Sequence, residues 1–424
     1  MGMKLGVIGC GRFSEEFVGP FKDHPLVEKI VLCDLYPERL KSFAAKFDIK
    51  DCMTDVEALL KSDIDSVAIF VQRHLHGPIT LQCLNAGKHV FGCVPIASSL
   101  EEIEQIVRAV EKTGLCYMTA ETSYYAPSAI YCRERYRRGH FGKFIYGESG
   151  YLHDMSEGFY EAFQHSGGKN WKAVAGIPPM YYPTHSMSHI LSIVDAHATH
   201  VSCLGFEEEH EDGIFRRGAN LWDNPFVNES ALLRLSNGGM MRANEFRRVV
   251  VSKESNFIYM TMMNGTDATY EQSSIGTAWM YRTAEGTHTV SLTERLKTNW
   301  KKDYDPNHVE RFVGKDNPYK TYEEGISCVH NYKRLPDSFC KYSNCHMGSH
   351  HYLIDDFCRA VSEGAIPPCH VWNAAHWCAP GLVAHESALK GGEQLSVPYF
   401  GAPPKGAKML QPDKAFFDAY QWEK

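Results

Sequence analysis

The sequence predicts an α/β chain, in which a parallel, doubly wound sheet is followed by a C-terminal α+β domain with a large, mainly antiparallel sheet. Strand and helix patterns alternate over residues 3–120, which is typical of parallel sheets. A glycine-rich turn closes the first strand, and beyond Glu121 the chain is dense in aromatic residues and histidines. We therefore expect a Rossmann domain over residues 1–121 and an α+β domain, which carries the chemistry, over residues 122–424.

Short apolar runs predict the strands of the first domain, and these runs are Met3–Ile8, Ile30–Asp34, Ser66–Val71, His89–Phe91 and Leu115–Ala120. One helix pattern begins at Pro37. The clearest helix covers Ser99–Thr113, where Ser99 and Glu102 have the spacing of a capping box. In the second domain, alternating residues predict strands over Ser230–Leu235 and Phe257–Met262, and helical spacing predicts helices over His351–Val361 and Ala374–Leu389.

Composition excludes several kinds of partner. The 424 residues carry a formal net charge of -7 and no basic block, so the chain lacks the clustered cations that nucleic acid requires. No apolar run approaches the ~18–20 residues that cross a bilayer, and the N-terminus lacks the features of a signal peptide. None of the 14 cysteines form C-x-x-C pairs. We expect a reduced, cytoplasmic protein that binds neither nucleic acid nor membrane.

One short segment contains several side chains of the types that bind zinc: Cys340, Cys345, His346, His350 and His351. Their spacing matches none of the usual closed zinc sites. The sequence analysis therefore predicts no metal here and treats these residues as core and surface positions.

The glycine-rich turn has the features of a dinucleotide site. Gly9 permits a tight turn, Gly11 lets the backbone approach a pyrophosphate, and Ser14 is small enough to keep the next helix close to the strand. Asp34 ends the second strand, where a carboxylate accepts hydrogen bonds from ribose hydroxyls and repels a 2′-phosphate. An N-cap role is the alternative for Asp34. We predict NAD as the cofactor.

Further motifs carry a resemblance to a known family. Leu75-His76 and Ala86-Gly87-Lys88-His89-Val90 resemble the nucleotide-domain signature of the Gfo/Idh/MocA (glucose–fructose oxidoreductase/inositol dehydrogenase) superfamily. The resemblance implies NAD binding and, as in many of its members, a homo-oligomer, a dimer or a tetramer. The cofactor contacts that we expect are Gly9, Gly11, Arg12, Phe13, Asp34, Val71, His76, Val94 and Pro95.

The chain departs from that family at one position. The family's dehydrogenases carry Glu-Lys-Pro where this chain has Cys93-Val94-Pro95, and valine cannot transfer a proton. Its NAD-dependent α-N-acetylgalactosaminidase-type glycosidases also have valine there. Two further stretches, Gly150-Tyr151-Leu152-His153-Asp154 and Tyr182-Pro183-Thr184-His185, resemble motifs of that branch.

The resemblance implies a redox-neutral glycosidase. In that branch bound NAD oxidises carbon 3 of the sugar, which acidifies the hydrogen at carbon 2 and allows the carbon 1 substituent to leave. The proton carriers that we expect are Glu121, Tyr151, Tyr182, His185 and His189, and the expected sugar contacts are His153 and Trp171. His185 and His189 are four residues apart, so they would share one face of a helix that begins near Thr184.

Two alternatives stay open at this point. A conventional sugar or polyol dehydrogenase would release NADH and would use His185 or His189 in place of the missing lysine. A regulatory NAD-binding protein would need none of these proton carriers. For both the glycosidase and the dehydrogenase, the expected partner is a small carbohydrate or glycoside.

Overall fold

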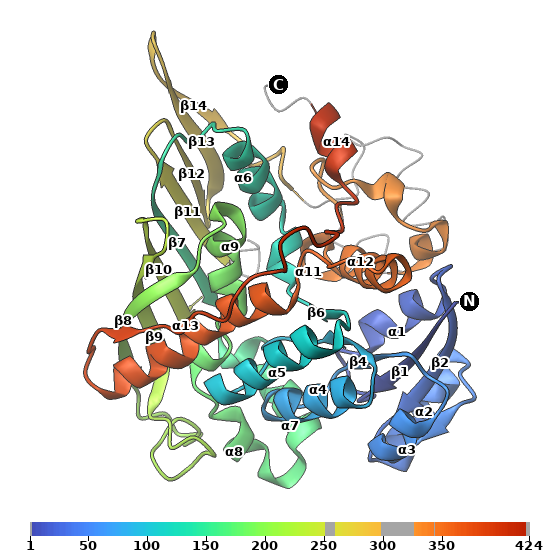
Figure 1. Ribbon diagram of the computed structural model, residues 1–424. Coiled ribbons are helices and arrows are strands. Elements are labelled where there is room, and N and C mark those ends of the chain that lie inside the picture. Colours follow the sequence, from blue (N-terminus) through green and yellow to red (C-terminus); the bar gives the residue numbers. More distant parts are fainter. Residues whose placement is uncertain (1, 251–258, 298–325, 343, 421–424) are drawn as a thin grey trace. The chain divides into compact units, whose positions relative to one another are not determined.

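The computed structural model describes residues 2–250, 259–297, 326–342 and 344–420 (Figure 1). By its contacts the chain forms two compact units. The first unit comprises residues 1–130, 295–374 and 401–424, and the second comprises residues 131–294 and 375–400. The predicted boundary after Glu121 separates the first sheet from the remaining chain, whereas the contacts also group two C-terminal segments with that sheet.

The first unit is built on a six-stranded parallel sheet with the order β3-β2-β1-β4-β5-β6. Its strands are β1 (Met3–Ile8), β2 (Val27–Cys33), β3 (Cys52–Met53), β4 (Ser66–Ile69), β5 (His89–Gly92) and β6 (Tyr117–Thr119). This order is that of a Rossmann sheet, whose switch point lies between β1 and β4. The predicted fold class is confirmed, and all five predicted strands are present. Only the two-residue β3 lacked a pattern that the sequence could reveal.

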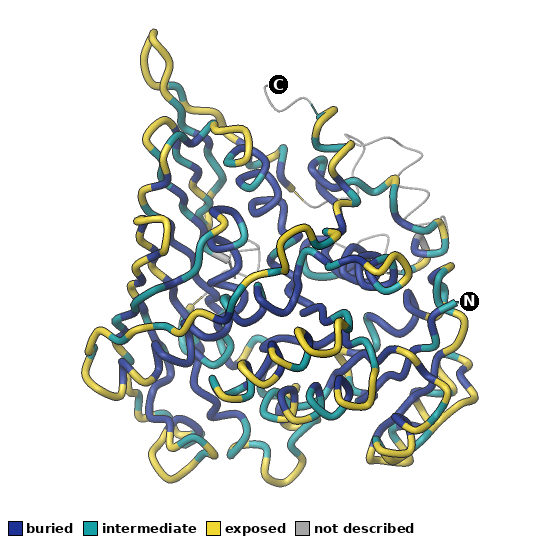
Figure 2. Tube along the Cα trace, viewed as in Figure 1, coloured by how far each residue is buried: buried dark blue, intermediate teal, exposed yellow. Residues whose placement is uncertain are grey.

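The helices of the first unit include α1 (Glu15–Lys22), α2 (Pro37–Phe47), α3 (Val56–Lys61), α4 (His76–Asn85), α5 (Leu100–Thr113), α11 (Cys345–Gly348), α12 (His350–Glu363) and α14 (Lys414–Ala419). Helices α1, α2, α3, α4 and α12 contact strands of the sheet, and Figure 2 shows exposed residues on α2, α3, α4 and α5. The Glu102 N–H donates to Ser99 Oγ over 3.2 Å, as the capping box predicts. The Glu102 carboxylate, however, accepts from the Ser98 N–H, one residue before the expected partner.

Helix α12 completes the core of the first unit, although it lies far along the chain. It packs against α1 and β1. The Phe357 ring lies 5.5 Å from that of Phe91 on β5 and 6.4 Å from that of Phe21 on α1. The predicted helix over His351–Val361 is therefore confirmed, and its apolar face covers the Rossmann core.

The second unit contains a nine-stranded sheet with the order β14-β13-β12-β11-β7-β10-β9-β8-β15. The strands are β7 (Phe144–Leu152), β8 (Ala198–Glu207), β9 (Phe226–Leu235), β10 (Met240–Phe246), β11 (Tyr259–Gly265), β12 (Ala268–Ser273), β13 (Gly276–Thr283), β14 (Gly286–Ser291) and β15 (Leu395–Ser396). All neighbours are antiparallel except β7 and β10, which are parallel. Helix α9 (Thr184–Val194) packs on β7 and β10. Residues 257 and 258 of the predicted strand lie outside the described residues.

Two helices, α6 (Pro127–Arg137) and α13 (Val371–Leu389), contain two of the four points at which the chain changes unit. The predicted helix over Ala374–Leu389 is the greater part of α13. Within the described residues, the helices are too short or too polar to cross a bilayer. The cysteines whose side chains are described are all free thiols.

Candidate active site

The glycine turn after β1 has the backbone that a dinucleotide site needs. Gly9 has a φ of 96°, and a Cβ there would lie 2.3 Å from the Phe70 carbonyl oxygen. A Cβ on Gly11 would meet nothing within 4 Å. Gly9 is therefore required by the packing of β1 against the residue after β4, whereas Gly11 leaves open space beside the start of α1. These two features fit a pyrophosphate at the switch point of the sheet.

Asp34 follows β2 and orders this turn. One carboxylate oxygen accepts from the Cys10 N–H over 2.8 Å, and the other accepts from the Tyr36 N–H over 2.9 Å. A carboxylate has about four acceptor positions, so capacity for ribose hydroxyls is left. The Arg39 guanidinium lies 3.8 Å from the same carboxylate and over the Tyr36 ring. Asp34 thus orders the turn through two backbone N–H groups and carries the charge expected to disfavour a 2′-phosphate, whereas the N-cap position of α2 is Tyr36 and not Asp34.

This charge leads to a prediction about cofactor choice. We expect the wild-type protein to bind NAD at least about tenfold more tightly than NADP, or about 1.4 kcal/mol. Asp34→Asn keeps an acceptor for the Cys10 N–H but removes the charge, while Arg39 stays in place. This variant should lose most of the preference, as measured by calorimetry with both cofactors. Equal or tighter NADP binding by the wild type would contradict the assignment of Asp34.

His76 joins two loops at the carboxyl edge of the first sheet. Its Nδ1 lies 2.7 Å from the Pro95 carbonyl oxygen, and its Nε2 lies 3.1 Å from the Val71 carbonyl oxygen. Burial lowers the pKa of His76 to about 4, so the neutral ring donates to one of these carbonyls. His76 therefore holds together the two segments that contain Val71 and Pro95, and all three residues are predicted cofactor contacts.

The remaining predicted cofactor residues lie on the same edge. Arg12 is exposed, and Phe13 packs on Phe17 and Phe70 while 38% of its surface is exposed. Val94 is buried just after β5, where the family's lysine would lie. Glu121 is also buried, and its Oε1 accepts from the Ser123 N–H over 2.8 Å, which caps a short turn of 3-10 helix.

In the second unit, Tyr151 at the end of β7 forms a hydrogen-bonded pair with His153. The Tyr151 hydroxyl lies 2.6 Å from His153 Nδ1, and His153 Nε2 lies 3.0 Å from the Glu157 carbonyl oxygen. Because a carbonyl can only accept, Nε2 carries the hydrogen in the neutral ring. Nδ1 is then the acceptor for the Tyr151 hydroxyl. A proton can therefore pass from tyrosine to histidine within this pair.

A second pair lies beside the first. The Tyr182 hydroxyl lies 3.2 Å from His185 Nε2, at the start of α9. The Tyr151 ring centroid lies 4.9 Å from that of His185 and 5.9 Å from that of Tyr182. Four of the predicted residues thus form one cluster, which we call the Tyr–His cluster: Tyr151, His153, Tyr182 and His185. His189 lies one helical turn further on, is fully buried, and its Nδ1 lies 3.1 Å from the His185 carbonyl oxygen.

The sequence analysis missed the charged residues that support this cluster. The Arg247 guanidinium lies 5.2 Å from the centre of the Tyr151 ring and is paired with Glu245 over 2.9 Å. The Ser186 hydroxyl donates to Glu245 over 2.5 Å. Burial raises the pKa of Glu245 to about 7, and Arg247 and Ser186 act in the opposite direction. The positive charge of Arg247 would stabilise a phenolate on Tyr151.

Another buried pair holds the segment that precedes Tyr182. Glu229 on β9 accepts from the Met180 N–H over 2.9 Å, and its other oxygen lies 2.7 Å from His385 Nδ1 on α13. Both side chains are buried. The turn that contains Met180 is therefore tied to the sheet and to α13.

Trp171 is placed differently from the Tyr–His cluster. It begins α8 (Trp171–Ala175), where its ring meets that of Tyr160 edge-on at 6.1 Å, and Lys172 lies over its face. These contacts are those of a packing residue at the edge of the second unit. Its expected sugar contact stays a prediction.

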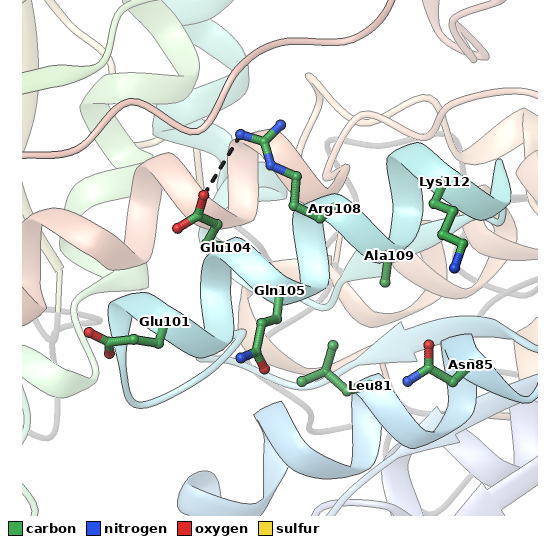
Figure 3. Close-up of a pocket in the computed structure, with 8 residues that line it drawn as sticks. All are labelled: Leu81, Asn85, Glu101, Glu104, Gln105, Arg108, Ala109 and Lys112. Atoms are coloured by element: carbon green, nitrogen blue, oxygen red, sulfur yellow. Dashed lines mark ion pairs between the residues drawn. The ribbon is translucent and has the colours of Figure 1, made fainter.

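A groove on the first unit lies between α4 and α5, and its lining is shown in Figure 3. Arg108 and Glu104 are paired there across one helical turn, 3.8 Å apart. The lining contains none of the predicted cofactor or proton-carrying residues. We therefore do not assign the chemistry to this groove.

Comparison with known proteins agrees with the nucleotide site. Residues 3–121 match a family described as oxidoreductases with an NAD-binding Rossmann fold. A glycosyl hydrolase family 109 protein from Streptomyces filamentosus is 21% identical over 94% of this chain and 77% of its own length. An alpha-N-acetylgalactosaminidase from Shewanella oneidensis is 26% identical over 44% of this chain and 43% of its own length.

Solved structures share the fold over almost the whole chain. A levoglucosan dehydrogenase in complex with NADH and L-sorbose superimposes with a TM-score of 0.67 at 17% identity. The match covers 94% of this chain and all of that one. At this identity the likeness establishes the architecture, while the match of residues 3–121 identifies the cofactor as NAD.

Proposed function

Because the chain belongs to the Gfo/Idh/MocA family of NAD-binding enzymes, we propose that it cleaves glycosides by transient oxidation at carbon 3 of the sugar. The observation that carries this proposal is the Tyr–His cluster of the second unit, together with Val94 at the position of the family's lysine. The distant glycosyl hydrolase relatives, which align over most of the chain, support the same reaction class.

The reaction is balanced without an external oxidant. NAD, when bound, supplies a hydride acceptor for carbon 3 and returns the same hydride at the end of the cycle. The resulting ketone acidifies the hydrogen at carbon 2, whose loss expels the group at carbon 1 and leaves a double bond between carbons 1 and 2. Water adds across this bond, with oxygen at carbon 1 and a proton at carbon 2.

The residues of the cluster would handle the protons of this cycle. Transfer of the Tyr151 proton to His153 Nδ1 leaves a phenolate beside the Arg247 guanidinium, which makes Tyr151 a base. The Tyr182–His185 pair is a second carrier, and the ring contacts place it next to the first. Two such carriers match the two positions, the carbon 3 oxygen and carbon 2, at which protons must be removed and returned.

Turnover in heavy water tests this proposal. We expect the released sugar to gain deuterium at carbon 2 and none at carbon 3, because the carbon 2 hydrogen leaves as a proton and the carbon 3 hydrogen leaves as a hydride. NADH should not accumulate. Mass spectrometry and NMR of the released sugar, with absorbance at the NADH band, provide the measurement.

The main alternative gives the opposite result. A sugar or polyol dehydrogenase would release NADH in proportion to the sugar oxidised, without exchange at carbon 2. That outcome would reject glycoside cleavage and would leave the family assignment and the NAD site intact.

A further inference from the structure

Three side chains that can bind a metal meet in the first unit. Glu16 lies in the first turn of α1, Cys345 begins α11, and His350 begins α12. One ligand atom from each lies within 4.8 Å of the other two. Cys345 Sγ and Glu16 Oε2 are 3.1 Å apart. Neither the spacing of residues 340–351 nor any local pattern could reveal this group, because Glu16 is more than three hundred residues away.

His350 is the member of this group whose placement needs an explanation. It is fully buried, and neither ring nitrogen has a hydrogen-bond partner in the described part of the chain. Its ring lies 4.4 Å from that of Phe17, 4.8 Å from that of His346 and 5.7 Å from that of Phe13. A buried polar group without a hydrogen-bond partner lowers the stability of the folded state, because it has lost its hydrogen bonds to water. A ligand for one of these nitrogens would remove part of this destabilisation.

We propose that Glu16, Cys345 and His350 bind a divalent transition metal of the zinc class. Thiolate, imidazole and carboxylate ligands together favour such ions over magnesium or calcium, which prefer oxygen ligands. Zinc bonds of about 2.0–2.3 Å place tetrahedral ligand atoms roughly 3.3–3.8 Å apart. Cys345 Sγ and Glu16 Oε2, which are 3.1 Å apart, are already near this spacing, and a ring nitrogen of His350 lies within 4.8 Å of a ligand atom of each. Three protein ligands leave a fourth position for water.

The metal would join distant parts of the first unit. Glu16 belongs to the helix that follows the glycine turn, while Cys345 begins α11 and His350 is the first residue of α12. Phe13, a predicted cofactor residue, already packs on His346 and His350. Binding to the folded state should therefore stabilise it by mass action, and this stabilisation should rise with the logarithm of the metal concentration above the Kd.

Cobalt(II) is a suitable probe, because a thiolate ligand gives it a charge-transfer absorbance in the near ultraviolet. We expect the reduced, chelator-treated full-length protein to bind about one cobalt ion per chain with this band, and zinc to displace it. Cys345→Ser should abolish the band, and Glu16→Gln should weaken binding at least about tenfold. The matched control is Cys52→Ser, because Cys52 is an exposed cysteine of the same unit that lies on β3.

The result distinguishes this site from other thiols. The proposal is rejected if the wild type shows no thiolate band, or if Cys345→Ser keeps it. Circular dichroism and the melting temperature of each metal-free variant establish that the fold is retained. As an independent measurement, zinc should raise the melting temperature of the wild type and of Cys52→Ser, but not that of Cys345→Ser.

Discussion

Tyr151→Phe is expected to slow glycoside cleavage by about 100-fold or more, which corresponds to about 2.7 kcal/mol in the activation free energy. The substitution removes the proton that Tyr151 shares with His153 and leaves the ring in contact with His185 and Arg247. The folding stability should therefore change little. Steady-state rates on aryl glycosides with NAD at saturation provide the measurement.

Tyr146→Phe is the matched control for this variant. Tyr146 lies on the same strand, β7, an odd number of residues away, so its side chain is on the opposite face of the sheet. Its hydroxyl lies 3.1 Å from Glu148. We expect nearly wild-type rates from this variant. Equal losses in both variants would show that the phenol of Tyr151 has no special role.

The second prediction with a large expected effect concerns Gly9 and Gly11, whose substitution by alanine should have different consequences. Gly9→Ala should lower the free energy of unfolding by about 3 kcal/mol, because it adds a strained positive φ to a clash with the Phe70 carbonyl oxygen. Gly11→Ala meets no such contact and should leave the stability within about 0.5 kcal/mol of the wild type. Its NAD affinity should nevertheless fall at least about tenfold, because the added methyl group occupies the space that we assign to the pyrophosphate.

Denaturant unfolding and calorimetry with NAD test this pair of variants. A stable Gly11→Ala variant with unchanged NAD affinity would mean that the cofactor does not approach this part of the turn. A stable Gly9→Ala variant would mean that the packing between β1 and Phe70 relaxes at low cost.

Much of the fold could be predicted from local patterns. The alternation of short apolar runs and helices is sufficient to predict a Rossmann sheet. The first residues of α5 and α9 could also be predicted, from Ser99 and from Pro183-Thr184 respectively. In the nine-stranded sheet, the predicted strand over Ser230–Leu235 is the second half of β9, whereas the order of the strands was not predicted. Its order includes a parallel pair, β7 and β10, which no short-range pattern reveals.

The same parallel pair explains why the candidate site was only partly predicted. Tyr151, His153, Tyr182 and His185 come from motifs that can be read along the chain. Glu245 and Arg247 reach them because Glu245 is paired with Tyr151 across the two strands, a relation that depends on the sheet order. The metal-binding group was missed for a similar reason, because its carboxylate comes from the other end of the chain.

The separation of α12 from the strands that it covers affects how the protein is made. Residues 1–130 are synthesised before α12 and contain every strand of the parallel sheet, yet the Phe357 side chain that packs on Phe21 and Phe91 is added only when residues 350–363 are synthesised. The apolar surface that α12 later covers is therefore exposed while residues 131–349 are being translated. This surface is of the kind that chaperones bind, and the synthesis of residues 350–363 determines when it is covered.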